Sequence, residues 1–287
     1  MRQWRQLLLG SYLHSTMPYR LFVNGRRARR GLAPVMVLFY HRVADDHPNP
    51  WTMSDDQFSR QILWLHQRFD LVSLEEAQRR IRCGNARAAV SITFDDGYAD
   101  NCHYALPFLV KHQIPCTYFV AAKNVFEGEP FPHDVQRGQP LLPNSLEQLR
   151  ALSGSSIEVA AHTRTHADLG AVSDTDQLFD EVIVATRDLE AALDRPIRYF
   201  AFPFGMHANL NQTAFHLAKE HGLEAVCSAY GGYNFPGDDP FHLQRIHADP
   251  KFVRLKNWLT VDPRKVNTRR FDYGLPCPNA LHLQAQG

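Results

Sequence analysis

The alternation of short apolar runs with amphipathic segments constrains the fold of this chain more than any other feature. The run VMVLFY (35–40) is continuous, apolar and rich in β-formers, which is typical of a strand buried on both faces. Similar runs predict further strands at 88–94, 116–122, 156–161, 197–202 and 224–229. Because segments with helical periodicity separate most of them, the pattern indicates an α/β fold with a parallel sheet or barrel.

The segments between the strands carry their own helix signals. Ser54 with Gln57, and Ser73 with Glu76, have the spacing of a capping box at the start of a helix. The periodicity predicts helices at 54–69, 73–81, 99–112, 145–152, 175–193 and 212–222. Residues 123–144 are rich in proline, glycine and charge, so we expect a long loop there, and one docked helix is expected after residue 250.

Composition bounds the domain organisation. The 287 residues are 44% hydrophobic with a formal charge of +1, which suits a globular protein and gives no reason to expect nucleic acid as a partner. No run of about 18 apolar residues occurs, so no membrane-spanning helix is expected. We divide the chain into a basic N-terminal segment (1–34), a main domain (35–250) and a C-terminal extension (251–287).

The N-terminal segment is unusual in charge. Between Met1 and Ala44 there are eight arginines and no acidic residue. The same stretch carries large apolar side chains, namely Trp4, Leu7, Leu8, Tyr12, Leu21 and Phe22. It is either a basic helix packed on its own domain or an amphipathic helix in peripheral contact with an anionic membrane.

The N-terminal segment makes a poor signal peptide, and the five scattered cysteines favour reduced thiols. We therefore expect a cytoplasmic protein, with the inner face of the membrane as the alternative location.

Polar residues follow four of the predicted strands at their carboxyl ends. These residues are His41 and Arg42, then Asp95, Asp96 and Gly97, then His162 to His166, and finally Pro203, Phe204 and Gly205. An isolated Asp-Asp-Gly is usually a turn, and fifteen histidines make chance pairs common. In a parallel α/β fold, however, the carboxyl ends of all strands meet at one edge, where functional sites form. The shared position therefore indicates one site.

The residue types at these strand ends suit metal-assisted hydrolysis. Two imidazoles and one carboxylate are a common catalytic zinc set that leaves one position for water. The metal lowers the pKa of that water and polarises a carbonyl, and a second carboxylate can act as general base. The adjacent aspartates can thus have different roles, one on the cation and one free to take a proton. Gly97 would let the backbone turn tightly enough for both to reach the site.

The motifs resemble those of a known family. TFDDGY (93–98), HTRTH (162–166), FAFPFG (200–205) and the strand-end segment LFYHRVADD (38–46) are similar to motifs of the polysaccharide deacetylases, the NodB-homology group of carbohydrate esterase family 4. The resemblance extends from about residue 35 to residue 249 and matches a branch with a permuted order of motifs. It implies a distorted (β/α)7-type barrel and a main domain that removes acetyl groups from N-acetylated, less often O-acetylated, sugars of a polysaccharide or glycan precursor.

The resemblance also implies roles for single residues. Asp96, His162 and His166 would hold the metal, usually zinc, and Asp95 would be the general base. The backbone N–H of Phe204 would stabilise the oxyanion. In the permuted branch the histidine after the first strand is the general acid, which here is His41.

The chain departs from the family pattern at one position. Ala201 stands where an arginine often orients the base, so Arg245 is the candidate replacement and nearby His247 is the second candidate acid. We also expect Arg42, Arg245 and His247 to contact substrate, which would be an acetylated glycan or a lipid-linked sugar. Two alternatives stay open at this point, a carbohydrate-binding protein with a decayed site and a metal-dependent glycosyltransferase.

Overall fold

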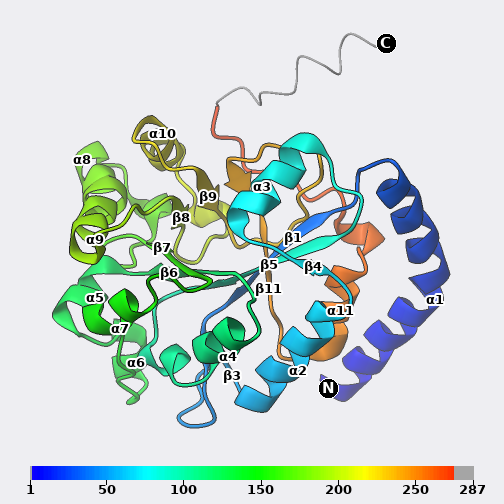
Figure 1. The fold of residues 1–287 in the computed structure, drawn as a ribbon, viewed down its shortest axis with the longest axis horizontal. Coiled ribbons are helices and arrows are strands. Elements are labelled where there is room, and N and C mark those ends of the chain that lie inside the picture. The colour runs from blue at the N-terminus through cyan, green and yellow to red at the C-terminus, as the bar shows by residue number, and fades with distance from the viewer. Residues whose placement is uncertain (1, 275–287) are drawn as a thin grey trace.

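The structure is a computed structural model that describes residues 2–274, and its centre is a nine-stranded sheet. The strand order is β10-β9-β8-β7-β6-β5-β1-β11, with β4 beside β5, and every pairing is parallel. The strands are β1 Val35–Tyr40, β4 Asp70–Leu71, β5 Ala89–Phe94, β6 Cys116–Val120, β7 Ile157–Ala161, β8 Tyr199–Ala201, β9 Ala225–Cys227, β10 His242–Leu243 and β11 Arg245–His247. Only Gln244 separates the strands at the two ends of this order, so the sheet nearly closes into a barrel (Figure 1).

Helices surround this barrel in Figure 1. They are α1 Arg2–Arg29, α2 Asp55–His66, α3 Leu74–Cys83, α4 Ala105–Lys111, α5 Ala122–Glu127, α6 Pro132–Gln136, α7 Leu146–Ala151, α8 Thr175–Phe179, α9 Ala185–Leu193, α10 Gln212–Glu220 and α11 Phe252–Leu259. The hydroxyls of Ser54 and Ser73 accept hydrogen bonds from the third residue after each, which confirms both predicted helix starts. A short separate sheet pairs β2 (Arg42–Val43) with β3 (Thr52–Met53). The predicted α/β barrel is therefore confirmed.

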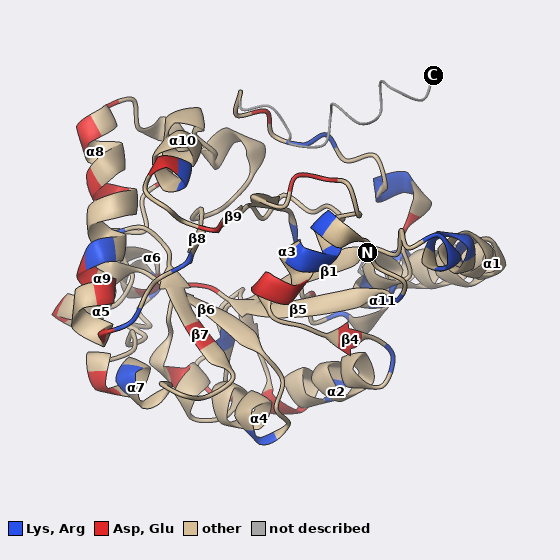
Figure 2. Ribbon diagram, turned by 45° about the horizontal axis from the view of Figure 1, so that its top comes forward, with Lys and Arg blue, Asp and Glu red and all other residues tan. Residues whose placement is uncertain are grey.

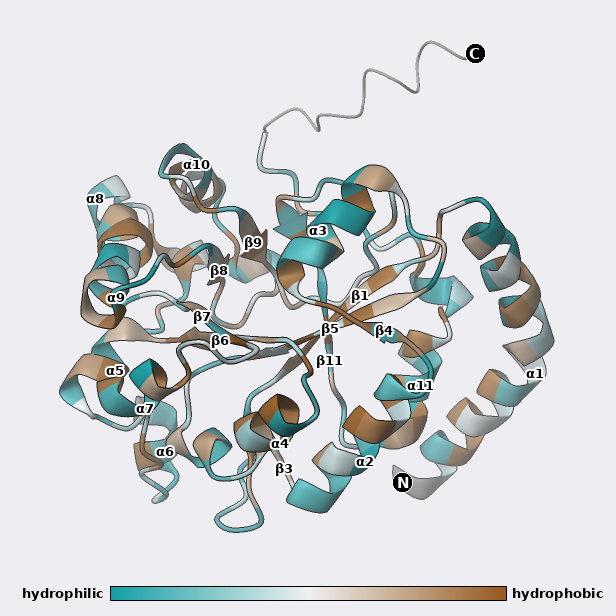
Figure 3. Ribbon diagram, in the orientation of Figure 1, coloured by the Kyte–Doolittle hydropathy of each residue, from teal (hydrophilic) through white to brown (hydrophobic). Residues whose placement is uncertain are grey.

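The continuous apolar runs are explained by burial on both strand faces. In β1, Met36 and Leu38 belong to the core between sheet and helices, whereas Val35 and Val37 belong to a second cluster on the opposite face. Figure 3 shows brown, the colour of hydrophobic residues, on β1. Each fully buried side chain of this size contributes roughly 1.5–3 kcal/mol, so an alternating polar pattern would not be tolerated here.

Two connections differ from the prediction. Residues 123–144 are not one loop, because α5 and α6 lie within them. Gly128, in the left-handed conformation (φ 68°), ends α5, and Pro132 begins α6. These helices have six and five residues, too few for a periodic signal. The predicted helix 175–193 forms, but its turn at Asp180–Val184 is a π-helix between α8 and α9.

Both ends of the main domain carry a packed helix. The basic N-terminal helix α1 lies on the outside of the barrel beside α11, which is the helix expected after residue 250 (Figure 1). The interpretation of α1 as a helix packed on its own domain is therefore confirmed. Residues 275–287 of the expected C-terminal extension lie outside the described residues. Between residues 2 and 274, no helix combines the length and the apolar character needed to cross a membrane.

Candidate active site

The strand ends that the sequence singled out converge on one pocket. His41 follows β1, Asp95 and Asp96 follow β5, and His162 follows β7 with His166 four residues later. Together with residues from other loops they line a cavity of about 580 Å³. The lining residues are Phe39, His41, Trp51, Asp95, Asp96, His133, Arg137, His162, His166, Phe204, Met206, Ala229 and His247. Seven of the nine predicted site residues thus line one cavity. The other two are Arg245, which contacts Asp95, and Arg42.

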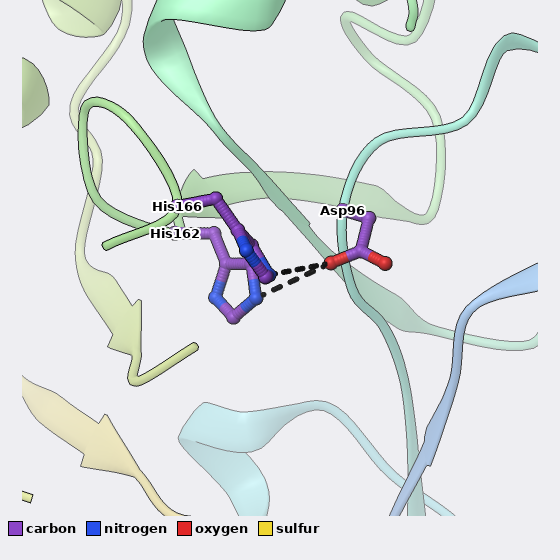
Figure 4. Close-up of side chains that lie close together, drawn as sticks. All are labelled: Asp96, His162 and His166. Atoms are coloured by element: carbon purple, nitrogen blue, oxygen red, sulfur yellow. Dashed lines mark ion pairs between the residues drawn. The ribbon is translucent and has the colours of Figure 1, made fainter. Parts of the chain in front are cut away.

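Asp96, His162 and His166 form the centre of this site (Figure 4). The Nε2 atoms of His162 and His166 lie 3.5 and 3.2 Å from Oδ1 of Asp96. The Nδ1 atom of His162 lies 2.7 Å from the carbonyl oxygen of Ala201. A carbonyl only accepts, so Nδ1 donates its hydrogen to Ala201, and Nε2 is the nitrogen that faces Asp96.

The same three residues fit a metal ion on chemical grounds. One ligand atom from each lies within 4.8 Å of the others. Oδ1 of Asp96 is buried and accepts no hydrogen bond from any described residue, although a buried carboxylate oxygen is costly to leave unpaired. Burial alone would raise the pKa of Asp96, but the two imidazoles outweigh it and hold that pKa well below its ordinary value. A cation bound by Oδ1 of Asp96 and the two Nε2 atoms would give this unpaired oxygen a partner.

The backbone around the ligands is held in a left-handed conformation. The φ angles are 72° at Asp96, 63° at Thr163 and 58° at His166, a region that costs residues other than glycine free energy. Gly97 follows Asp96 with φ 81°, and a Cβ atom there would lie 2.9 Å from Cγ1 of Val120. The predicted need for glycine after the two aspartates is therefore confirmed by both conformation and space.

The second aspartate, Asp95, forms a buried ion pair with Arg245. The guanidinium donates two hydrogen bonds, of 2.6 and 2.8 Å, to the two carboxylate oxygens. Arg245 is completely buried and also donates to the carbonyl oxygen of Ser228. Burial would raise the pKa of Asp95, but Arg245 outweighs it and the pKa lies below its ordinary value. The arginine missing at Ala201 thus has a geometric counterpart that reaches Asp95 from β11.

Two further imidazoles, those of His41 and His247, also line the pocket. His41 and His247 lie with ring centroids 6.4 Å apart, and Trp51 is 4.9 Å from His41. The Nδ1 atom of His41 is buried and has no hydrogen-bond partner among the described residues. Burial lowers the pKa of His41, and Asp96 and Asp95 oppose that shift. Burial, and then His41, lower the pKa of His247 to about 4.

Phe204 borders the pocket beside the histidines. Its ring centroid lies 5.1 Å from that of His166, and its side chain is 57% exposed. Its φ of 61° turns the backbone at this point, and a Cβ at Gly205 would lie 2.6 Å from the backbone nitrogen of Ala229. Within residues 2–274, no acceptor takes a hydrogen bond from the Phe204 amide. This N–H is therefore available to a ligand.

Arg42 is not among the residues that line the pocket. Its guanidinium is almost fully buried and is held by Asp100, by Asp46 and by the carbonyl oxygen of His47. Arg245 is likewise occupied by Asp95. Contact of these two arginines with substrate stays a prediction, and the structure gives both of them protein partners.

Sequence reasoning missed several residues of the site. Trp51, His133 and Arg137 line the pocket from segments without regular periodicity. Glu181, 4% exposed, accepts hydrogen bonds from the backbone N–H groups of Arg164 and Thr165, at 3.0 and 2.9 Å. It thereby supports the loop between the two histidines from the π-helical turn. Only Trp51 had a usable signal, since it ends the proline-rich stretch HPNPW just after a strand-end histidine.

The fold and the site define a class of protein, a parallel α/β barrel that carries an Asp-His-His cluster at the carboxyl ends of its strands and a separate buried Asp-Arg pair beside it. Comparison with known families gives the assignment within that class. The profile of the polysaccharide deacetylase family matches residues 82–226. This chain belongs to the polysaccharide deacetylase family and is an enzyme of that kind.

Individual relatives agree with the family. The chain is 29% identical over 140 residues to the chitooligosaccharide deacetylase of Bradyrhizobium sp. (strain ANU 289), a match that covers 48% of this chain and 54% of that protein. The Streptococcus pyogenes deacetylase PplD, solved in complex with acetate, superposes with a TM-score of 0.68 at 20% identity over 81% of this chain and all of that one. IcaB from Ammonifex degensii gives a TM-score of 0.64 at 25% identity over 79% and 97% of the two chains.

Proposed function

We propose that this protein hydrolyses the acetamido group of N-acetylated sugars in a polysaccharide or oligosaccharide, and that Asp96, His162 and His166 hold a divalent zinc ion for this reaction. The observation that carries the proposal is the buried, unpaired Oδ1 of Asp96 facing two imidazole nitrogens. A set of two nitrogens and one oxygen favours zinc over magnesium. The relative named as a chitooligosaccharide deacetylase supports an N-acetylated substrate over an O-acetylated one.

The residues of this chain divide the reaction among them. When bound, the cation lowers the pKa of water and polarises the acetyl carbonyl. Asp95 takes a proton from the attacking water, and Arg245 keeps the Asp95 carboxylate in a fixed orientation and ionised. Phe204 donates its free backbone N–H to the oxygen on which negative charge develops.

His41 is the residue we assign to protonate the departing amine. Burial lowers the pKa of His41 and so disfavours its imidazolium, which therefore depends on nearby negative charge. The nearby carboxylates of Asp96 and Asp95 favour keeping the proton until it is needed. His247, whose pKa is lowered to about 4, is the less suitable donor near neutral pH, and we assign it to contact with the sugar at the pocket wall.

The alternative of a decayed binding protein rested on the missing arginine at position 201. Arg245 now supplies the guanidinium beside Asp95, so that motivation falls away. The membership of the family likewise removes the reason to consider a glycosyltransferase.

The test is release of acetate by the purified chain with added zinc or cobalt. The substrates should include chitooligosaccharides, polymeric N-acetylated glycans, O-acetylated glycans and lipid-linked amino sugars. We expect release from an N-acetylated member of this set. Release only from O-acetylated glycans would contradict the substrate assignment, and no release with any metal would contradict the function.

A further inference from the structure

The outer face of α1 is apolar and basic, and nothing in the described part of the chain covers it. Large hydrophobic side chains exposed on the surface of residues 4–274 are concentrated on this helix, with six of the 15 lying there. These six are 50% to 72% exposed and are Trp4, Leu7, Leu8, Tyr19, Leu21 and Phe22. Isolated exposed apolar residues are ordinary, but a row of them on one helix marks a contact surface.

The inner face of α1 is fixed to the barrel, so the outer face is not needed for packing. The buried Arg20 donates hydrogen bonds of 3.0 and 2.8 Å to the backbone and side-chain oxygens of Asn257 in α11. Tyr12 donates to Asp262 at 2.9 Å, and Asn24 donates to the carbonyl oxygen of Thr260 at 3.0 Å. The helix is thus held as part of the domain with its opposite side turned to solvent.

The outer face follows the period of the helix. At 100° per residue, Trp4, Leu8, Phe22 and Arg26 fall within about 40° of one another, while the buried Leu13 lies opposite them. The intervening positions on that face are small, being Ser11 and Ser15. The large side chains thus lie in an apolar strip along one side of a helix of 28 residues, in two groups separated by the two serines.

The charge of α1 indicates which kind of surface its apolar strip would bind. Helix α1 contains no acidic residue, and arginines 26, 27 and 29 occupy its last turn. Figure 2 shows blue and no red on this helix, and Figure 3 shows brown patches along it. An apolar strip with an interfacial tryptophan and tyrosine, bordered by arginines, is complementary to an anionic lipid surface, where acyl chains take the apolar side chains and lipid phosphates take the guanidinium groups.

We propose that the outer face of α1 is a docking surface for an anionic lipid bilayer, on which the enzyme binds peripherally with α1 lying in the plane of the interface. This surface is separate from the proposed function, because it shares no residue with the site. The inference can therefore fail while the deacetylase proposal stands, and the reverse also holds.

The test is co-sedimentation of the full chain with vesicles of phosphatidylcholine alone and of phosphatidylcholine with phosphatidylglycerol at three to one. We expect binding to the anionic vesicles that weakens strongly in 0.5 M salt, since the charge contribution is screened. The double variant Arg26→Gln/Arg29→Gln should bind at least about tenfold more weakly, since each arginine near an anionic surface contributes about a fivefold factor. Arg60→Gln/Arg82→Gln, which removes two exposed arginines from α2 and α3, should bind as wild type does.

The apolar strip is tested by Leu8→Ser/Phe22→Ser, for which we expect loss of binding by about tenfold or more. Leu63→Ser/Val110→Ser is the matched control, since these residues are 42% and 38% exposed on α2 and α4. Brominated phosphatidylcholine in the anionic vesicles should quench part of the tryptophan fluorescence, and Trp4→Phe should remove that part. Circular dichroism and acetate release establish that each variant is folded.

Three outcomes would overturn the inference. One is wild-type protein that does not bind anionic vesicles at low salt. Another is equal binding by the α1 variants and their controls. The third is sedimentation equilibrium showing that Leu8→Ser/Phe22→Ser converts a dimer to a monomer without changing vesicle binding, which would assign the strip to a second copy of the chain.

Discussion

Arg245 holds Asp95 through two parallel hydrogen bonds, although the two residues lie 150 positions apart in the chain. The pairing depends on topology, because β11 is the neighbour of β1, and β1 is the neighbour of β5, which Asp95 follows directly. A carboxylate that must accept a proton from water gains a fixed orientation and an ionised state from such a partner. Asp96 beside it has no arginine partner and lies next to the imidazoles of His162 and His166.

We expect Arg245→Lys to lower kcat by about a hundredfold, because a lysine cannot hold both carboxylate oxygens and a small misplacement of a catalytic group has an effect of this order. Bound zinc and KM should change little, since the metal ligands are untouched. Acetate release and metal content measure these quantities. Arg20→Lys is the matched control, a buried arginine with ion-pair and hydrogen-bond partners far from the pocket, and it should lower stability without lowering kcat. Equal loss of kcat in both variants would mean that Arg245 acts only through stability.

A second experiment should distinguish the proposed metal ligands from the proposed general acid. We expect His162→Ala to abolish retention of zinc after dialysis. We expect His41→Ala to retain zinc and to have a kcat lowered by about 10²–10⁴-fold. The physical reason is that our proposal makes His162 one of three ligands, whereas it assigns His41, which lines the same pocket, to donate a proton. Metal content by mass spectrometry and acetate release give both numbers. Zinc retained at full stoichiometry by His162→Ala would contradict the ligand assignment.

Glu181 should affect metal affinity although it lies outside the ligand set. Its carboxylate accepts the N–H groups of Arg164 and Thr165 and the Thr165 hydroxyl, so it fixes the loop between His162 and His166. We expect Glu181→Ala to weaken zinc binding by about 10–100-fold, the usual effect of removing a residue that orients ligands. Competition with a chromogenic chelator measures the affinity.

The control for this variant lies on the same helix. Glu190 also accepts a backbone N–H, that of Ile197 at 3.0 Å, but it supports a loop far from the ligands. Glu190→Ala should therefore leave zinc affinity unchanged. If both variants weaken zinc binding equally, general loosening of the helix explains the effect and the specific role of Glu181 is lost.

Much of this architecture is encoded locally and could be predicted. Strands such as β1 and β5 are continuous apolar runs because both faces are buried, and parallel strands bring His41, Asp95 and His162 to one edge. Most of the site could therefore be predicted from the position of these residues after the strands.

The rest depends on tertiary contacts that leave no local trace. The short helices α5 and α6 have too few turns for a period, and α6 with its C-cap residue brings His133 and Arg137 to the pocket. A π-helical turn has no distinctive composition, so the role of Glu181 was invisible. For Arg42, the position after a strand suggested the pocket, whereas its guanidinium pairs with Asp100 and Asp46, and its contact with substrate stays a prediction.

His242 should make the protein sensitive to acid. Its imidazole is buried against Phe215 and lies 3.0 Å from the Ser228 hydroxyl, and burial lowers its pKa to about 3. The unfolded chain has the ordinary histidine pKa of about 6.5, so between about pH 6.5 and 3 the unfolded state binds a proton that the folded state does not. The free energy of unfolding should therefore fall as the pH falls, by about 2 kcal/mol from this residue between pH 7 and pH 5.

The variant His242→Gln isolates this contribution, since glutamine can hydrogen-bond to Ser228 but does not titrate. We expect it to be less stable than wild type at pH 7, because of imperfect packing, and to lose about 2 kcal/mol less on acidification to pH 5. Urea unfolding at both pH values measures the difference, and His103→Gln, which alters an exposed histidine, should titrate as wild type does. If His242→Gln and wild type lose the same stability between pH 7 and pH 5, His242 is protonated in the folded protein and burial does not set its pKa.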